Sequence, residues 1–241
     1  MTQQNMSGQE KSQEKDPKPE TKTERLVELG SSVVTNRHGT IHCLTIIGQI
    51  EGHTNAPDNA KTTKYEHLLP LLASLEESDE VDGVLILLNT VGGDVEAGLA
   101  LAEMIAGMTK PTATLVLGGG HSIGIPLAVS GKINMIAPSA SMTVHPVRMS
   151  GTMIAAPQTY RYFDKLQESI VRFVAAHSQI RAETFRELML RTDEMANDVG
   201  SVLYGEDAVA LGLMQQVGTL KDALAALYRA IDEGKKQENR G

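Results

Sequence analysis

The stretch Thr112–Gly124 reads TATLVLGGGHSIG and decides the fold. Its first six residues are β-branched or apolar, which predicts a strand buried on both faces of a parallel sheet. The glycines Gly118–Gly120 then allow backbone angles and close approaches that a Cβ would block. Residues 123–130 read as a short apolar helix, with Pro126 in the first turn where its missing N–H is tolerated. Ser122 is therefore expected at a strand-to-helix corner.

Ser122 also lies at the centre of a G-x-S-x-G pattern, Gly120-His121-Ser122-Ile123-Gly124. In its structural context, a strand before and a helix after, this pattern presents a serine nucleophile. A helix N-terminus stabilises a developing oxyanion through its N–H groups and its dipole. The pattern alone leaves two interpretations open, because serine is also a common helix cap.

A second glycine pair and a histidine favour the catalytic interpretation. The buried-strand run Val84–Leu88 leads into Asn89-Thr90-Val91-Gly92-Gly93 and then into helical spacing over residues 94–108. Two parallel strands would thus end in glycines at one edge of the sheet, which is where open α/β folds bind ligands. The run Met142–His145 ends in a histidine 23 residues after Ser122, so His145 can return to the same edge.

The apolar pattern predicts alternating strands and helices, and such alternation indicates an α/β fold with parallel strands. Expected strands are 41–50, 84–89, 112–117 and 132–136, with strand-like runs at 142–144 and 199–204; expected helices are 65–75, 94–108, 123–130, 160–177, 182–190 and 220–231. Pro70 should kink the first of these helices or mark its true start. Residues 1–25 are polar with alternating charge, which is typical of a disordered tail.

Three blocks of the chain resemble, in order and spacing, the active-site blocks of the ClpP peptidase family: Leu88–Gly93, Gly120–Gly124 and Val144–Pro146. The resemblance runs from about residue 41 to residue 217. It implies an α/β fold of the ClpP/crotonase type, a superhelix of repeated ββα units with a projecting long helix. Within the family the chain is similar to a branch named for enhancing protein translocation.

The domain organisation follows from this resemblance and from composition. Residues 26–234 are expected to form a single peptidase domain, and residues 235–241 a polar C-terminal end. The apolar stripe from Tyr160 to Val174, with Met153 and Ile154 beside it, is interpreted as core-facing in part and as an assembly surface in part. The resemblance implies a homo-oligomeric ring, a peptide or unfolded protein as substrate, and a possible ATPase partner.

The resemblance also implies roles for individual residues. Ser122 would be the nucleophile and His145 its base, and the backbone N–H groups of Gly93 and Ile123 would form the oxyanion hole. Three glycines are expected to contact the substrate: Gly92, Gly119 and Gly120. The implied reaction is hydrolysis of peptide bonds by acyl transfer, linked to protein export, without a cofactor.

The acid of the triad is the position where the chain departs most from the family. Counting back from Gly212-Leu213 without gaps places the family's aspartate at Gly200. Asp198, two residues earlier, is the nearest candidate to orient His145. Alternatively, Asp193, Glu194 and Asp198 simply form a solvated acidic face. If Asp198 is not the acid, either Asp193 orients His145 or the site is a Ser-His dyad.

Three other functions remain to be weighed. A crotonase-type acyl-CoA enzyme would use the same fold but would not need a serine and a histidine at this spacing. An α/β-hydrolase requires a histidine after the acid, where the chain offers only His177, within a helical pattern. A catalytically weak ClpP-like scaffold stays possible because the acid is uncertain.

Composition excludes several partners. The net charge of −8 without a basic cluster disfavours nucleic acid, and no apolar run is long enough for membrane insertion. The spacings of His53, His67 and His177 fit no zinc motif, so no metal is expected. The single Cys43 is interpreted as a small core residue, and the chain as cytoplasmic.

Overall fold

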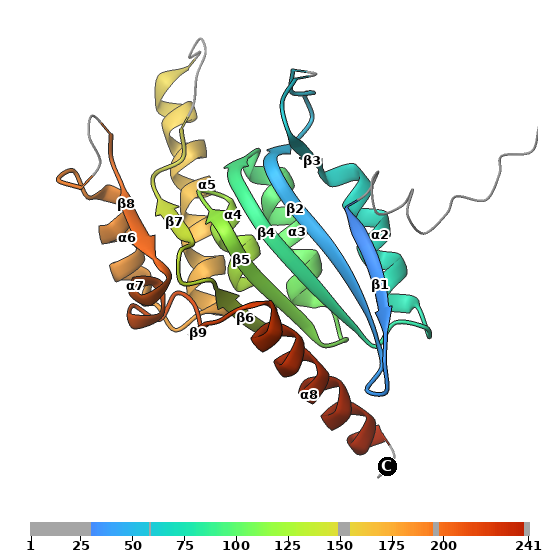
Figure 1. Ribbon diagram of the computed structural model, residues 1–241. Coiled ribbons are helices and arrows are strands. Elements are labelled where there is room, and N and C mark those ends of the chain that lie inside the picture. Colours follow the sequence, from blue (N-terminus) through green and yellow to red (C-terminus); the bar gives the residue numbers. More distant parts are fainter. Residues whose placement is uncertain (1–29, 58, 149–154, 195–197, 239–241) are drawn as a thin grey trace, which may run out of the picture.

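The computed structural model describes residues 30–57, 59–148, 155–194 and 198–238 (Figure 1). The tail predicted for residues 1–25 lies outside this part of the chain, as do Met153 and Ile154 of the expected assembly surface.

A mixed sheet of nine strands forms the centre of the fold (Figure 1). Its main path runs β1-β2-β4-β5-β6-β9, with bounds Ser31–Thr35, Thr40–Glu51, Gly83–Gly93, Thr112–Gly120, Ile133–Ile136 and Gln216–Val217. All neighbours from β2 to β9 on this path are parallel, which confirms the predicted parallel sheet, whereas β1 is antiparallel to β2. The three strands off this path are β3 (Thr62–Lys64), β7 (Ser141–Val144) and β8 (Ser201–Tyr204).

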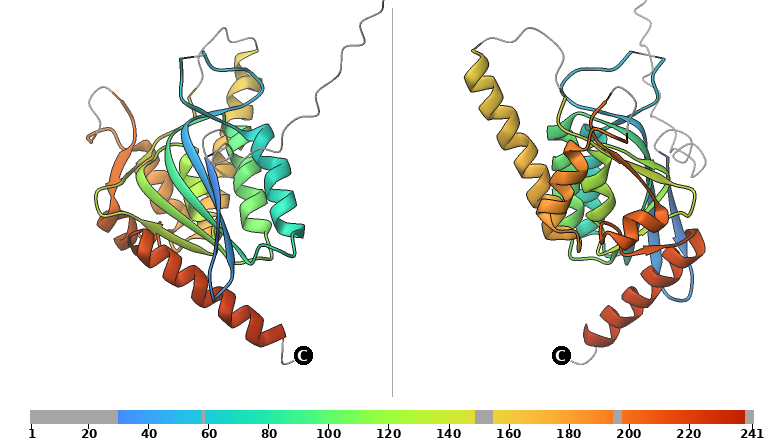
Figure 2. Two further views of the ribbon diagram at one scale, coloured as in Figure 1. Left: turned by 45° about the vertical axis from the view of Figure 1, so that its right-hand side comes forward. Right: turned by 90° about the vertical axis from the view of Figure 1, so that its left-hand side faces the viewer.

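Helices cover both faces of the sheet. Those of the described chain are α2 (Tyr65–Glu77), α3 (Val95–Gly107), α4 (Gly124–Val129), α5 (Ala156–His177), α6 (Ala182–Leu190), α7 (Gly205–Ala210) and α8 (Leu220–Glu238). Buried side chains of α2 to α6 share one hydrophobic cluster with one face of the sheet, and α8 packs against the other face with Ile41, Leu85 and Leu115 (Figures 1 and 2). The α/β class is therefore confirmed.

The strands β4 and β5 read as continuous apolar runs because both of their faces are buried. Leu88 and Val116 on one face and Leu85 and Leu115 on the other are at most 1% exposed. Each such side chain contributes on the order of 1.5–3 kcal/mol by its removal from water. This core fixes the two strands whose ends carry the glycines.

Several elements differ from the sequence-based expectation. Both β4 and β5 continue through their glycines, to Gly93 and Gly120, because those residues still pair with neighbouring strands. Helix α2 begins at Tyr65 and contains Pro70, so the alternative that Pro70 marks the helix start is wrong. Pro70 is in the second turn, where its missing N–H removes the one ladder bond to the Glu66 carbonyl.

The long helix α5 extends the predicted stripe in both directions. Its C-terminal half is core-facing, with Ile170 and Val174 buried. Its N-terminal half projects from the body of the protein (Figure 2, right) and exposes Tyr160 and Tyr162. None of the helices in the described part of the chain is long and apolar enough to cross a membrane.

Candidate active site

Ser122 occupies the corner between β5 and α4, as the sequence predicts. Its φ of 57° is in the left-handed region, which costs a residue with a Cβ about 1–3 kcal/mol and is typical of functional positions. The corner is held by the Ser122 N–H, which donates to the Thr143 carbonyl over 2.9 Å, and by the Ile125 N–H, which donates to the Ser122 carbonyl over 3.0 Å. The hydroxyl-bearing residue is thus fixed by β7 on one side and α4 on the other.

Gly92 packs directly against the serine. A Cβ at this position would lie 2.6 Å from the Ser122 Cβ and 2.9 Å from the His121 carbonyl oxygen. Gly92 also has a φ of 90°, which side-chain-bearing residues rarely adopt. The glycine pair of β4 and the serine corner of β5 therefore meet at one edge of the sheet, which was the central geometric prediction.

The two predicted oxyanion donors, Gly93 and Ile123, line one cavity with Ser122. The Asp94 N–H donates to the Ile50 carbonyl over 3.0 Å. Ile50 is the ladder partner of Gly93, and in a parallel ladder such a residue bonds to the two residues on either side of its partner. The Gly93 N–H therefore faces away from β2, toward the side of β5. Among the described residues, the Ile123 N–H makes no turn or loop hydrogen bond.

Thr90 holds the two glycine turns together, a role that the sequence analysis missed. Its buried hydroxyl donates to the Gly48 carbonyl over 2.6 Å and accepts from the Gly92 N–H over 3.0 Å. Its carbonyl accepts from the His121 N–H over 3.1 Å. A hydroxyl is the smallest group that can both donate and accept here. The threonine two residues before the glycine pair was the sequence signal that could have indicated this role.

His145 lines the same cavity as Ser122, at the end of β7. Its Nδ1 lies 2.7 Å from the Pro146 carbonyl oxygen. A carbonyl only accepts, so Nδ1 carries the proton and Nε2 of the neutral ring is left as an acceptor. Burial lowers the pKa of His145 below its ordinary value of 6.5. The hydrogen bond to the Pro146 carbonyl raises this pKa, the Arg148 charge lowers it further, and the Asp198 charge raises it. The ring is therefore poised as a neutral base.

Asp198 is not joined to His145. One carboxylate oxygen accepts from Arg148 Nη2 over 2.6 Å, and the other accepts from the Val199 N–H over 2.8 Å. Asp193 is 82% exposed and faces Arg191 at 4.0 Å. Gly200, where the gapless count places the family's acid, has a φ of 136°, and a Cβ there would lie 2.3 Å from the Val144 carbonyl oxygen. No side chain fits at position 200, so the acid cannot occupy it.

The cavity beside Ser122 and His145 has a volume of about 190 Å³. Apolar side chains from five elements and from the turn after β7 form most of its wall: Val95, Ile125, Val144, Val147, Ile170, Phe185 and Met189. A space of this size and lining accommodates a single apolar side chain.

The remaining candidate residues lie away from this cavity. Gly119 and Gly120 are buried, and a Cβ at these positions would face the His121 ring and Val116, respectively. Neither glycine lines the cavity beside Ser122. His177 stacks on Phe173 within α5, and burial raises the pKa of the Cys43 thiol. In the part of the chain that the structure describes, no three His, Cys, Asp or Glu side chains gather in a way that could hold a metal ion.

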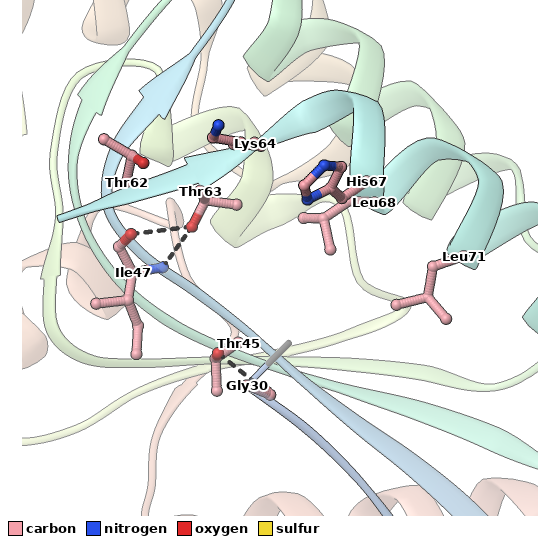
Figure 3. Close-up of a pocket in the computed structure, with 9 residues that line it drawn as sticks. All are labelled: Gly30, Thr45, Ile47, Thr62, Thr63, Lys64, His67, Leu68 and Leu71. Atoms are coloured by element: carbon pink, nitrogen blue, oxygen red, sulfur yellow. Dashed lines mark hydrogen bonds between the residues drawn. The ribbon is translucent and has the colours of Figure 1, made fainter. Parts of the chain in front are cut away.

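A larger hollow of about 390 Å³ lies where β1 and β3 begin (Figure 3). The Thr63 hydroxyl, which lines it, hydrogen-bonds both the N–H and the carbonyl of Ile47 over 2.9 Å. Lys64 and His67 are its titratable lining residues, and it contains no serine or cysteine. The serine and histidine expected to be catalytic line the smaller cavity around Ser122 instead.

The parallel sheet with its two glycine-rich strand ends, and the serine and histidine that share one cavity there, are features of a Clp-type protease. The profile of the Clp protease family matches residues 39–221, and the chain belongs to this family. It is 50% identical to the Translocation-enhancing protein TepA of Halalkalibacterium halodurans over 217 residues, which are 90% of this chain and 85% of that protein. It is also 25% identical to the protein named Putative protease MJ0651 of Methanocaldococcus jannaschii, over 71% of this chain and 62% of that protein. The predicted resemblance to the family and to its translocation-enhancing branch is confirmed.

Proposed function

We propose that the protein is a serine endopeptidase in which Ser122 and His145 cleave peptide bonds by acyl transfer. The observation that carries this proposal is the shared cavity: a serine in a left-handed strand-to-helix corner and a histidine with Nε2 free to accept line it together with two backbone donors. Membership of the Clp protease family supports the same activity.

The mechanism follows from these groups. Nε2 of His145 takes the Ser122 proton as the hydroxyl oxygen attacks the scissile carbonyl, and the N–H groups of Gly93 and Ile123 stabilise the oxyanion. The imidazolium then gives its proton to the leaving amine, which frees the first product. Water, deprotonated by the same Nε2, hydrolyses the acyl-serine and regenerates the hydroxyl. The Pro146 carbonyl keeps the tautomer that this cycle requires.

The substrate class that the cavity favours is an extended peptide with an apolar side chain before the scissile bond. The floor of the cavity is made of Ile170, Phe185 and Met189, which are at most 8% exposed. A charged side chain placed there would lose its hydration without a partner, at a cost of several kcal/mol. Gly93, at the exposed end of β4, is the proposed backbone contact, whereas Gly92 is buried and its N–H is bound by the Thr90 hydroxyl.

Cleavage of peptides that differ only in this one residue tests the proposal. We expect leucine or methionine at that position to be cleaved at least ten-fold faster than aspartate or lysine, and no cleavage by Ser122→Ala. Cleavage that persists in Ser122→Ala would contradict the proposal.

Two alternatives use the same fold. A crotonase-type enzyme would consume acyl-CoA thioesters, and a weak scaffold would cleave neither substrate. The ordered tautomer of His145 favours the peptidase over both, because neither alternative needs a general base beside a serine. Incubation with acyl-CoA esters and with peptides, in parallel, separates the three functions.

Ring assembly is part of the proposal. Tyr160 and Tyr162 are 71% and 50% exposed on the projecting half of α5, and two neighbouring aromatic side chains in water favour burial against another copy of the chain. An ATPase that feeds the ring, and an involvement in protein export suggested by the name of the relative TepA, are proposed on family membership alone. Light scattering that reports a monomer at micromolar concentration would contradict the ring.

A further inference from the structure

The pairing of β7 with β8 explains how an acid displaced by two residues can still serve His145. The last antiparallel pair is Val144 with Ser201. Continued by one residue, this register places Gly200 opposite His145, which agrees with the 2.9 Å between a Cβ at Gly200 and the His145 Cβ. Asp198 lies two residues before Gly200, beyond the last pair of the two strands.

Beyond this pair the chain leaves strand geometry, since Gly200 has a φ of 136°. Asp198 is placed instead by its bond to Arg148, which lines the same cavity as His145. The charges of Arg148 and Asp198 both act on His145. The carboxylate two residues before Gly200 thus stays near the His145 ring.

The structure shows both groups with other partners. Asp198 is bound to Arg148, whose guanidinium also borders the catalytic cavity, and the ring N–H of His145 is bound to the Pro146 carbonyl. The side chains of Arg148 and Asp198 are 53% and 39% exposed. An ion pair with this exposure is weak, so its partners can exchange.

We propose that Arg148 is a positioning residue that competes with His145 for Asp198, so that the site alternates between a Ser-His dyad and a complete Ser-His-Asp triad. This inference rests on the proposed peptidase function. When Arg148 holds Asp198, the Pro146 carbonyl alone orients the ring. When Arg148 releases it, the carboxylate accepts the Nδ1–H and stabilises the imidazolium that forms during acyl transfer.

Two charged groups act on His145 from the segments around it, Arg148 and Asp198, and a further titratable group, His121, lies at the β5–α4 corner, where burial and then His145 lower the pKa of His121. Arg148 lowers the His145 pKa and Asp198 raises it. The Nδ1 of His121 is bound to the Thr143 hydroxyl over 2.8 Å, away from this competition.

The experiment compares wild type, Arg148→Gln, Asp198→Asn and the double variant. The first readout is the rate at which a fluorophosphonate labels Ser122, measured across pH so that the plateau rate and the pKa of its acid limb are separated. The second readout is the His145 pKa from NMR titration, with the signal assigned through His145→Gln. Arg191→Gln is the control, because Arg191 makes an exposed ion pair outside the cavity and should leave both readouts unchanged.

We expect Arg148→Gln to raise the plateau labelling rate about two- to five-fold, the range that an exposed ion pair allows, and to move the acid limb to higher pH. In the Asp198→Asn background the plateau gain should vanish. A gain of the same size in both backgrounds, or an unchanged plateau with only a shifted limb, would show that Arg148 acts through its charge alone and would overturn the proposal.

The NMR titration keeps this inference separate from the proposed function. If Ser122 is not labelled in any of the proteins, the peptidase proposal fails, and the His145 pKa still decides the competition. The proposal requires Asp198→Asn to lower the His145 pKa more in the Arg148→Gln background than in wild type. An equal lowering in the two backgrounds would contradict it.

Discussion

Replacing Gly92 by alanine perturbs the catalytic serine through a single added methyl group. The new Cβ would lie 2.6 Å from the Ser122 Cβ, 2.9 Å from the His121 carbonyl oxygen and 3.2 Å from the Ser122 hydroxyl oxygen. All three neighbours belong to the β5–α4 corner. The corner or the end of β4 must therefore move.

The size of the effect follows from these distances. Carbon atoms in contact prefer a separation of about 3.5–4.0 Å, so Ser122 and the end of β4 must move apart by about 1 Å. A displacement of about 1 Å at a reacting centre costs roughly 100-fold in rate. The φ of 90° at Gly92 adds about 1–3 kcal/mol of strain to the folded state of the alanine variant.

The assay is the rate of Ser122 labelling by a fluorophosphonate, with the melting temperature of each protein measured alongside. Gly107→Ala is the matched control, because a Cβ at the end of α3 meets no atom within 4 Å. We expect the control to label at the wild-type rate and to melt at the same or a higher temperature, since alanine is the better helix former. A Gly92→Ala protein that labels at the wild-type rate would refute the described packing of the two strand ends.

Three further predictions concern titratable groups. Asp198→Asn should reduce the labelling rate by far less than the roughly 10⁴-fold loss that follows from a wrong histidine tautomer, because the Pro146 carbonyl still fixes the His145 Nδ1–H. Asp193→Asn should leave the labelling rate unchanged. Equal losses in the two variants would count against this. The base must be neutral, and burial lowers the His145 pKa, so the acid limb of the labelling rate should fall below pH 6.5; a limb above that value would contradict the burial of the ring. Burial also lowers the pKa of His42, whose Nε2 has no partner among the described residues. The unfolded chain therefore takes up a proton at higher pH than the folded protein does, so the stability of the folded protein should fall as the pH drops below 6.5. His42→Leu should lessen this fall, measured as melting temperature against pH. An undiminished fall in the variant would exclude His42 as its source.

Much of the site could be predicted because buried parallel strands have an unmistakable pattern. The apolar runs before Gly92 and Gly118 fix two neighbouring strands, and the ends of parallel neighbours meet at one edge. The distance along the chain from Ser122 to His145 spans one helix and one strand, which returns the histidine to that edge. Each of these patterns is local in the sequence, and together they fit one arrangement of the strands.

Other features depend on pairings that a single sequence does not reveal. The short strands β3 and β9 pair through only three and two residues, which is too few for a recognisable pattern. The contact of Asp198 with Arg148 depends on how the chain runs beyond the last pair of β7 and β8. Thr90 gains its role from contacts to Gly48 and Gly92, which lie on two strands.

The central claim is that Ser122 is a nucleophile activated by His145. Mass-spectrometric mapping of the site labelled by a fluorophosphonate tests this claim most directly. The account predicts one modified residue, Ser122, in wild type and the loss of this label in His145→Ala, with the fold of that variant intact by circular dichroism. Labelling at another residue, or labelling of Ser122 that persists at the wild-type rate without His145, would contradict it.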